Sequence, residues 1–268
     1  MALKSPEQFR ESLRKLRPNI YKFGDLIQDV TTNPHTKGTI EGHAQLYGAA
    51  LDPQYSDLFS TTSHLTGDKV SRYLAINGGP EDMIANCKMK RAAYHLTGTC
   101  TGGRCAGYNC LNSMWATTYD MDQDLGTDYH QRLSDWLRYA QDNDLTVSGA
   151  LSDPKGNRSL PPSQQADPDM NVHVVEVRDD GIVVRGAKTM ICGVAAAQEI
   201  FILPGSGYKE ADQDYSVSFV VPKDIEGLTI VEARHPSDTR EAEEGFDVPV
   251  KIGGITQALF KVFDPRQF

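Results

Sequence analysis

The spacing of apolar residues divides the chain into two parts. Up to about residue 143, apolar side chains recur every three or four positions, which is the period of a helix that buries one face. After Asn143 the period shortens to two, which is typical of half-buried strands. The pattern therefore predicts an α+β protein with a helical domain over residues 1–145 and an antiparallel β domain of barrel or sandwich type over residues 146–268.

Helix-start signals and apolar periodicity predict several helices in the first part. Ser5-Pro6-Glu7-Gln8 is typical of a helix start, with Ser5 as N-cap and Gln8 closing a capping box. Further helices are expected at 53–60, from 80 to about 94, from 108 to about 124, and after an N-cap at Thr127. The side chains expected to be buried by these helices are Phe9, Leu13, Leu16, Ile20, Met83, Ile84, Cys87, Met89, Leu111, Met114, Trp115, Thr118, Leu133, Trp136, Leu137 and Ala140.

Alternating apolar residues and turn signals predict strands in the second part. In VHVVEVRDDGIVVRG, Asp179-Asp180-Gly181 separates two valine-rich runs, which predicts a β-hairpin. Other strand-like segments are EIFILP, DYSVSFVVP, GLTIVEA, DVPVKI and ALFKVFD. The long polar stretch DPKGNRSLPPSQQADPD lies between the two parts, and a loop of this length is usually either functional or disordered.

Composition and charge narrow the class of protein. The 268 residues are 39% hydrophobic and 24% charged, as in an ordinary globular protein, and the net charge is −9. This charge, without a basic stripe, disfavours nucleic acid and anionic membranes as partners. The N-terminal segment MALKSPEQF has no signal-like apolar run, and no window approaches the roughly 20 apolar residues of a membrane span. We therefore expect a cytoplasmic protein.

The segment HLTGTCTGGRCAGYNC contains three of the five cysteines. The glycines at 102 and 103 place Cys100 in a loop and Cys105 near the start of the next helix, so the two sulfurs could converge. Two thiolates alone leave a tetrahedral metal or an iron–sulfur cluster short of ligands. From the residues alone, free thiols packed between helices are therefore the favoured interpretation, and a metal site is the alternative.

Two basic features could hold an anion. Arg104 and Tyr108 are four residues apart, so they would share one helical face suited to an anionic or phenolic ligand. The alternative is a surface arginine beside a core tyrosine. Lys155 and Arg158 flank Gly156 in the long loop, which could hold a phosphate or the edge of a flavin. No G-x-x-x-x-G-K-[ST], G-x-G-x-x-G, H-E-x-x-H or G-x-S-x-G pattern occurs, which excludes the corresponding enzyme classes.

Several longer motifs, in order, resemble one known family along nearly the whole chain. They are SLRKLRPNIYKFGDLI, DPQYSDLF, TTYDMDQDLGTDYH, SDPKGNRSLPPSQQADPD and DGIVVRGAKT. The chain resembles the 4-hydroxybutyryl-CoA dehydratase branch of the 4-hydroxyphenylacetate 3-hydroxylase family. The resemblance implies an acyl-CoA dehydrogenase-like fold, in which a helical domain and a middle β domain precede a C-terminal helical bundle, and a homotetramer around FAD.

The resemblance also implies roles for particular residues. Cys100 and Cys105 correspond to two ligands of a [4Fe-4S] cluster, and Gln257 stands where a catalytic glutamate is expected. Arg104 and Tyr108 correspond to the substrate pair of the hydroxylase branch. Residues expected to line the flavin are Leu151, Ser152, Asp153, Lys155, Gly156, Asn157, Arg158, Gln164, Lys188, Cys192 and Gly193.

The function implied is dehydration of a small hydroxyacyl-CoA, with FAD as cofactor and a [4Fe-4S] cluster as a further candidate that would act on the substrate hydroxyl. One alternative is flavin-dependent hydroxylation of a phenol, although Gly149 stands where that branch carries a histidine. A third reading is a non-catalytic scaffold. Since the C-terminal bundle is absent after ALFKVFDPRQF, we expect either a fragment or a half-enzyme that forms a homo-oligomer or binds a separate C-terminal subunit.

Overall fold

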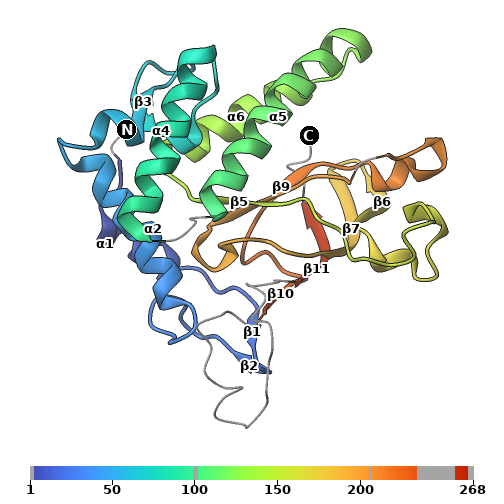
Figure 1. Ribbon diagram of the computed structural model, residues 1–268. Helices are drawn as coiled ribbons and strands as arrows, with labels where there is room; N and C mark the ends of the chain where they lie inside the picture. Colours follow the sequence, from blue (N-terminus) through green and yellow to red (C-terminus); the bar gives the residue numbers. More distant parts are fainter. Residues whose placement is uncertain (1–2, 99–101, 206, 234–256, 265–268) are drawn as a thin grey trace.

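A helical part and a β part lie side by side in the computed structural model (Figure 1). The structure describes residues 3–98, 102–205, 207–233 and 257–264. The helices are α1 (Pro6–Arg14), α2 (Lys37–Leu51), α3 (Ser56–Phe59), α4 (Pro80–Thr97), α5 (Gly102–Leu125) and α6 (Tyr129–Asp142). The strands are β1 (Ile20–Lys22), β2 (Asp25–Leu26), β3 (Ser60–Thr62), β4 (Lys69–Ser71), β5 (Val147–Ala150), β6 (His173–Arg178), β7 (Gly181–Lys188), β8 (Glu199–Ile202), β9 (Phe219–Pro222), β10 (Leu228–Glu232) and β11 (Gln257–Asp264).

Helix α1 begins as the sequence predicts, whereas helix α6 begins with a different cap. The capping box at Ser5 is present, since the Ser5 side chain accepts from the Gln8 N–H and the Gln8 side chain accepts from the Ser5 N–H. Helix α6, however, is not capped by the Thr127 side chain. The Asp122 carboxylate accepts from the N–H groups of Tyr129 and His130 and from the Thr127 hydroxyl. A carboxylate seven residues upstream therefore replaces the expected local cap.

The burial expected for α4 was partly wrong. Met89 is fully buried, but Met83 and Ile84 are 60% and 55% exposed, and Cys87 is exposed as well. The helix rests on α2 and α3 through the face that carries Met89 and Ala93. Apolar residues occur on both sides of α4, so helical periodicity alone could not show which side faces the core.

The strands form three sheets rather than one antiparallel domain. The six-stranded sheet has the order β2-β1-β10-β11-β7-β6, and smaller sheets are formed by β5-β8-β9 and by β3-β4. The expected hairpin is present as β6 and β7. Two pairs are parallel, β1 with β10 and β5 with β8, and the described strands do not close into a barrel. The segment DVPVKI lies outside the described residues.

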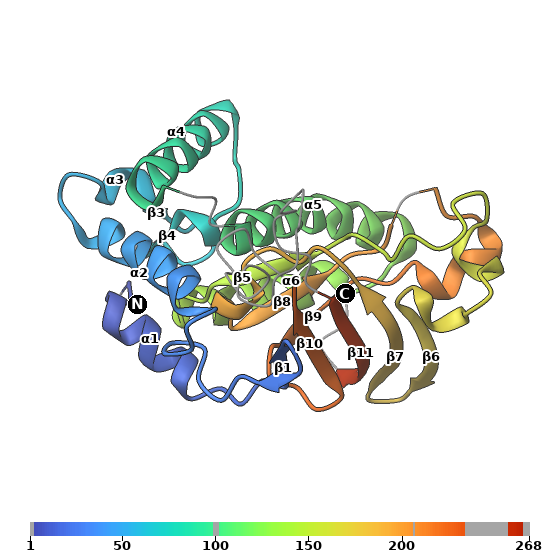
Figure 2. The same cartoon turned by 60° about the horizontal axis from the view of Figure 1, so that its bottom comes forward.

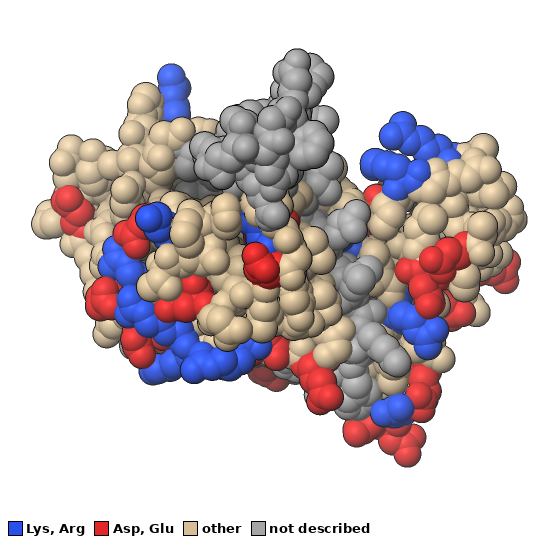
Figure 3. Space-filling view, turned by 90° about the horizontal axis from the view of Figure 1, so that it is seen from below, with Lys and Arg blue, Asp and Glu red and all other residues tan. Residues whose placement is uncertain are grey.

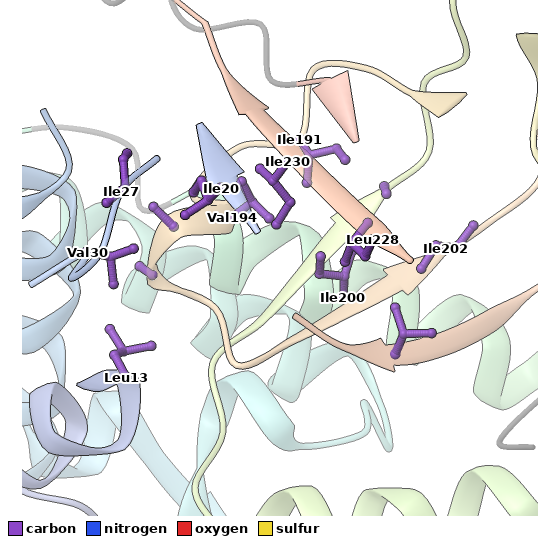
Figure 4. Close-up of a cluster of buried hydrophobic side chains, with 14 of the residues drawn as sticks. Leu13, Ile20, Ile27, Val30, Ile191, Val194, Ile200, Ile202, Leu228 and Ile230 are labelled. Atoms are coloured by element: carbon purple, nitrogen blue, oxygen red, sulfur yellow. The ribbon is translucent and has the colours of Figure 1, made fainter. Parts of the chain in front are cut away.

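The six-stranded sheet joins the two parts of the chain. Ile20 in β1 lies opposite Ile230 in β10, and both are fully buried. Figure 4 shows them in one cluster with Val194, Ile200 and Leu228. The first 145 residues therefore contribute strands to the sheet as well as helices. The proposed domain boundary near residue 146 stays a prediction.

Helix α5 lies along the three-stranded sheet β5-β8-β9, where it packs closely against β5 (Figure 2). Trp136, Leu137 and Phe201 fill the space between α6 and this sheet. Among the described residues, no helix has the length and apolar character needed to cross a membrane. Figure 3 shows acidic and basic side chains intermixed over one face of the molecule.

Candidate functional site

A polar cleft lies between the long loop and the segment after β8. Its volume is about 410 Å³, and it is lined mainly by residues 153–162 and by Gly205, Gly207, Tyr208 and Lys209. Lys155, Arg158 and Lys209 are exposed at the cleft, and none forms an ion pair with any described residue. Three exposed cations around one cleft, in a chain of net charge −9, favour an anionic ligand.

The loop that forms the cleft is held by one side-chain amide. Gln165 Oε1 accepts from the Asn157 N–H at 2.9 Å, and Gln165 Nε2 donates to the carbonyl groups of Asn157 and Leu160 at 2.9 and 3.0 Å. A Cβ at Gly156 would lie 2.3 Å from both Gln165 Oε1 and Met170 Sδ, so a side chain here would displace the amide that holds the loop. The predicted residue Gln164 is exposed in a short 3-10 turn and does not line the cleft.

A buried lysine fixes one wall of the cleft. Lys188 Nζ lies 2.6 Å from Asp153 Oδ1 and donates to the Leu151 carbonyl at 3.2 Å. Burial lowers the pKa of Lys188, and the Asp153 carboxylate opposes that shift. Tyr208 donates to Asp153 Oδ2 at 3.5 Å, and burial raises the Tyr208 pKa to about 12. The wall therefore brings together five predicted residues, namely Leu151, Ser152, Asp153, Lys188 and the adjoining loop residue Lys155.

The predicted segment 188–193 continues from this wall to the start of α5. Thr189 donates its N–H to the Ser152 carbonyl at 2.8 Å. Gly193 has a φ of +65°, and a Cβ there would lie 2.6 Å from the Gly103 nitrogen. Cys192, next to it, is exposed. The structure therefore places Cys192 and Gly193 against α5, although no residue of α5 lines the cleft.

Arg104, in the first turn of α5, is enclosed by protein. Its side chain is 2% exposed, donates to Ser71 Oγ at 3.0 Å and lies 3.5 Å from Asp144 Oδ1. The guanidinium also stacks between the rings of Tyr47 and Tyr73, at 4.3 and 4.8 Å. Burial raises the pKa of Asp144, and the Arg104 charge opposes that rise. These contacts make Arg104 part of the packing, and its predicted substrate role stays a prediction.

Tyr108 lies in different surroundings from Arg104. Its hydroxyl donates to Asn77 Oδ1, and Lys90 Nζ lies 5.6 Å from its ring centroid. Burial raises the pKa of Tyr108, so the phenol stays protonated near neutral pH. The expected arginine–phenol pair therefore shares a helix, but each member has its own partners.

The described cysteines do not form a metal site. Cys105 is half-buried at the start of α5, and Cys100 lies outside the described residues. Within the described part of the chain, no three His, Cys, Asp or Glu side chains come together. Cys110 is buried, which raises its pKa to about 12, so it is an inert thiol. Gln257 is the first residue of β11, where its backbone pairs with Val231 of β10.

Two glycines allow α5 and β5 to touch. A Cβ at Gly107 would lie 2.1 Å from the Val147 carbonyl oxygen, and one at Gly149 would lie 2.7 Å from Cys110 Sγ. There is consequently no room for a side chain at position 149. The signal in the sequence was a glycine within each of two buried elements, which often marks a close backbone approach.

Sequence reasoning missed three polar residues near these sites. Lys209 and Tyr208 line the cleft but belong to no motif. His43 in α2 lies against Gly103 and Gly193, with Nδ1 2.9 Å from the Thr39 carbonyl oxygen. Burial lowers the pKa of His43 to about 4, so the ring is neutral near pH 7. Only the fold brings these residues to the site.

Comparisons with known proteins agree with this architecture. The chain is 42% identical, over 265 residues, to 4-hydroxybutyryl-CoA dehydratase/vinylacetyl-CoA-Delta-isomerase of Clostridium aminobutyricum, covering 98% of this chain and 54% of that protein. It is 31% identical to the oxygenase component of 4-hydroxyphenylacetate 3-monooxygenase of Thermus thermophilus, covering 90% of this chain and 47% of that protein. The chain thus spans about half the length of the curated relatives it matches.

The solved structures that resemble this chain include the same two kinds of enzyme. An oxygen-tolerant archaeal 4-hydroxybutyryl-CoA dehydratase from N. maritimus superposes with a TM-score of 0.90 at 33% identity, covering 98% of this chain and 53% of that one. The HpaB oxygenase component complexed with FAD gives a TM-score of 0.77 at 25% identity, covering 99% and 55%. The family model described as 4-hydroxyphenylacetate 3-hydroxylase N terminal matches residues 5–265. The chain therefore belongs to the 4-hydroxyphenylacetate 3-hydroxylase N-terminal family.

Proposed function

We propose that this chain is part of a flavin-dependent enzyme that dehydrates a small hydroxyacyl-CoA. The observation that carries the proposal is the 42% identity to a 4-hydroxybutyryl-CoA dehydratase over 98% of the chain. The related monooxygenase from Thermus thermophilus is less similar, at 31% identity. The branch of the family is thus inferred from similarity, and the residues of the cleft support the flavin part of the proposal, which both branches share.

The cleft residues fit a ligand that carries phosphates. Lys155, Arg158 and Lys209 present positive charge at an open cleft, and Arg158 can donate two parallel hydrogen bonds to a phosphate. Asp153 is already paired with Lys188, so its negative charge is compensated and does not repel such a ligand. FAD, when bound, would supply electron transfer to and from the substrate. In this proposal the three cations hold its phosphates, and the Lys188–Asp153 pair keeps the cleft wall in place.

The described residues do not supply the ligands of a [4Fe-4S] cluster. Cys105 is the described member of the predicted pair, and Cys192 is an exposed thiol on a different segment. We keep Cys100 and Cys105 as candidate ligands, to be tested by iron and sulfide analysis of anaerobically purified protein. A metal-free protein with intact thiols would reject them.

Gly149 favours dehydration over hydroxylation. The hydroxylase branch carries a histidine at this position, as the sequence resemblance implies. Here any Cβ at 149 would approach Cys110 Sγ to 2.7 Å and the Ala106 carbonyl carbon to 3.2 Å. An imidazole could enter only if α5 moved away from β5. The chain therefore has no place for that side chain in its present packing.

The proposal is tested by two assays on the same preparation, alone and with any separate C-terminal subunit. The first supplies 4-hydroxybutyryl-CoA and FAD under anaerobic conditions and follows loss of water by mass. The second supplies reduced FAD, oxygen and 4-hydroxyphenylacetate and follows catechol formation. We expect product in the first assay only. Catechol formation without dehydration would replace the proposal with the hydroxylase alternative, and inactivity in both assays would favour the scaffold.

A further inference from the structure

The carboxylate of Asp212 joins the two walls of the polar cleft. Its side chain is fully buried in the short 3-10 turn Glu210–Tyr215, which lies beside the long loop (Figure 2). Oδ1 accepts from the Ser163 N–H at 3.0 Å, and Oδ2 accepts from the Lys209 N–H at 3.0 Å. Ser163 directly follows the cleft-lining stretch 153–162, whereas Lys209 lies on the opposite wall. One buried carboxylate therefore holds both walls by their backbones.

The loop segment that Asp212 holds also fixes the turn that carries Arg158. Gln165, two residues after the bonded serine, holds this turn by its three hydrogen bonds to Asn157 and Leu160. The Leu160 N–H donates to the Asn157 carbonyl group at 3.0 Å, which closes a β-turn with Arg158 at its second position. The placement of Arg158 therefore depends on the same carboxylate as that of the cation on the opposite wall.

The charge of Asp212 acts against an anionic ligand. Hydrogen bonds from the Ser163 side chain and from the N–H groups of Ser163 and Lys209 hold the pKa of Asp212 below its usual range, so the carboxylate is ionised near neutral pH. A negative charge beside an anion-binding cleft weakens binding through electrostatic repulsion. Any benefit of Asp212 to such a ligand must therefore come from the positions of the residues that it holds.

We propose that Asp212 is a positioning residue, which holds Lys209 and the Arg158 turn on opposite walls of the cleft and so arranges the cations for a ligand with adjacent phosphates. A cleft arranged in advance has less to order when the ligand binds, which increases affinity. The inference deepens the proposed function and rests on it, because it requires that the cleft receives the phosphates.

The test is isothermal titration calorimetry of the full chain with FAD and with inorganic pyrophosphate. Asp212→Asn keeps the size of the side chain but replaces one acceptor oxygen by an NH₂ group, which cannot accept from a second N–H. We expect this variant to raise both dissociation constants about tenfold. The matched control is Asp214→Asn, which removes the same charge from an exposed position in the same turn. It should leave both constants unchanged or lower them slightly.

Two further variants separate positioning from a general loss of structure. Ser163→Ala, at an exposed position, removes one hydrogen bond to Asp212 and should raise both constants about threefold. In a Lys209→Gln background, Asp212→Asn should weaken binding less than in the wild type, because one of the cations that it positions is gone. A general loss of structure would weaken binding equally in both backgrounds and would contradict the positioning role.

The outcomes separate this inference from the proposed function. If Asp212→Asn binds both ligands as tightly as the wild type, or more tightly, the inference is wrong and the proposed function stands. If the wild type binds pyrophosphate but not FAD, and Asp212→Asn weakens that binding, the inference stands and the flavin part of the proposed function is wrong. A wild type that binds neither ligand would overturn both. Circular dichroism shows whether Asp212→Asn is folded, and if it is not, unchanged binding by Ser163→Ala would reject the inference.

Discussion

Two regions of the molecule differ in how their predicted site residues are surrounded. One is the contact between α5 and β5, which is closed by protein, and the other is the polar cleft, which is open to solvent. At the contact, Gly107 and Gly149 leave no space between helix and strand, and Arg104, earlier on the same helix, is 2% exposed and paired with Asp144. At the cleft, Lys155, Arg158 and Lys209 are exposed. Both regions contain predicted site residues. Those at the cleft are exposed, whereas Arg104 is enclosed by protein.

The difference shows how a motif residue should be interpreted. Arg104 stands in the predicted substrate pair, yet its guanidinium is enclosed by protein, where it donates to Ser71, pairs with Asp144 and stacks between two tyrosine rings. Arg158 has a weaker sequence signal but an available guanidinium. Desolvated charges that lose a partner are costly, whereas exposed ones are not. Substitutions at the two regions should therefore affect different properties, namely stability at the contact and ligand affinity at the cleft.

The largest effect is expected for Gly107→Ala. The added methyl group would lie 2.1 Å from the Val147 carbonyl oxygen, so α5 and β5 must separate. We expect a loss of about 3 kcal/mol or more in the free energy of unfolding, measured in urea. The matched control is Gly38→Ala in α2, where nothing lies within 4 Å, and which should stabilise by up to about 1 kcal/mol. Similar stabilities for the two variants would show that the contact is not tight.

A loss of about 3 kcal/mol, at the lower end of that expected for Gly107→Ala, is expected for Arg104→Met, because it leaves the Asp144 carboxylate buried without its ion-pair partner. Asp144 has a φ of +38°, which asparagine tolerates, so Asp144→Asn is a suitable second variant. The double variant should be more stable than the sum of the two single losses predicts. Strict additivity in urea unfolding would mean that the two side chains do not act as a pair.

A pH effect of about 2 kcal/mol distinguishes buried from exposed cations. Burial lowers the pKa of Lys223 to about 7, against the opposing charges of Asp224 and Glu232, and the unfolded value is about 10.4. Lys223 donates to the Ala195 carbonyl at 2.7 Å, and His43 lies near enough to be affected by its charge. Between these pKa values the unfolded chain binds the extra proton, so stability rises with pH.

From pH 7 to pH 9 this group should add about 2 kcal/mol to the free energy of unfolding. Lys223→Met should lack that increment, whereas Lys155→Met, at the exposed cleft, should retain it. Unfolding in urea at the two pH values gives the comparison. Equal pH dependence in wild type and Lys223→Met would place the titration elsewhere.

Much of the local structure could be predicted from the sequence. The capping box at Ser5 and the hairpin at Asp179-Asp180-Gly181 depend on neighbouring residues, and both are present. Contacts between distant segments could not be predicted this way. The pairing of Ile20 with Ile230 and the orientation of α4, which leaves Ile84 exposed, depend on which surfaces meet in the folded chain.

The candidate site was predictable to the extent that it is continuous in sequence. The loop with Lys155 and Arg158 does form a cleft wall. Lys209, on the opposite wall, belongs to no sequence motif. The sequence around Arg104 likewise does not indicate that Asp144 and two tyrosine rings enclose this residue. In both cases the deciding contact comes from residues 30 or more positions away, which neither spacing nor residue type reveals.

The central claim is that the cations of the cleft hold the phosphates of FAD. The most direct measurement is the dissociation constant for FAD, by fluorescence titration, of wild type, Arg158→Gln and the surface control Lys69→Gln. We predict that Arg158→Gln raises the constant about tenfold, with unchanged stability, while Lys69→Gln leaves it unchanged. An Arg158→Gln variant that binds FAD as tightly as the wild type would contradict the account.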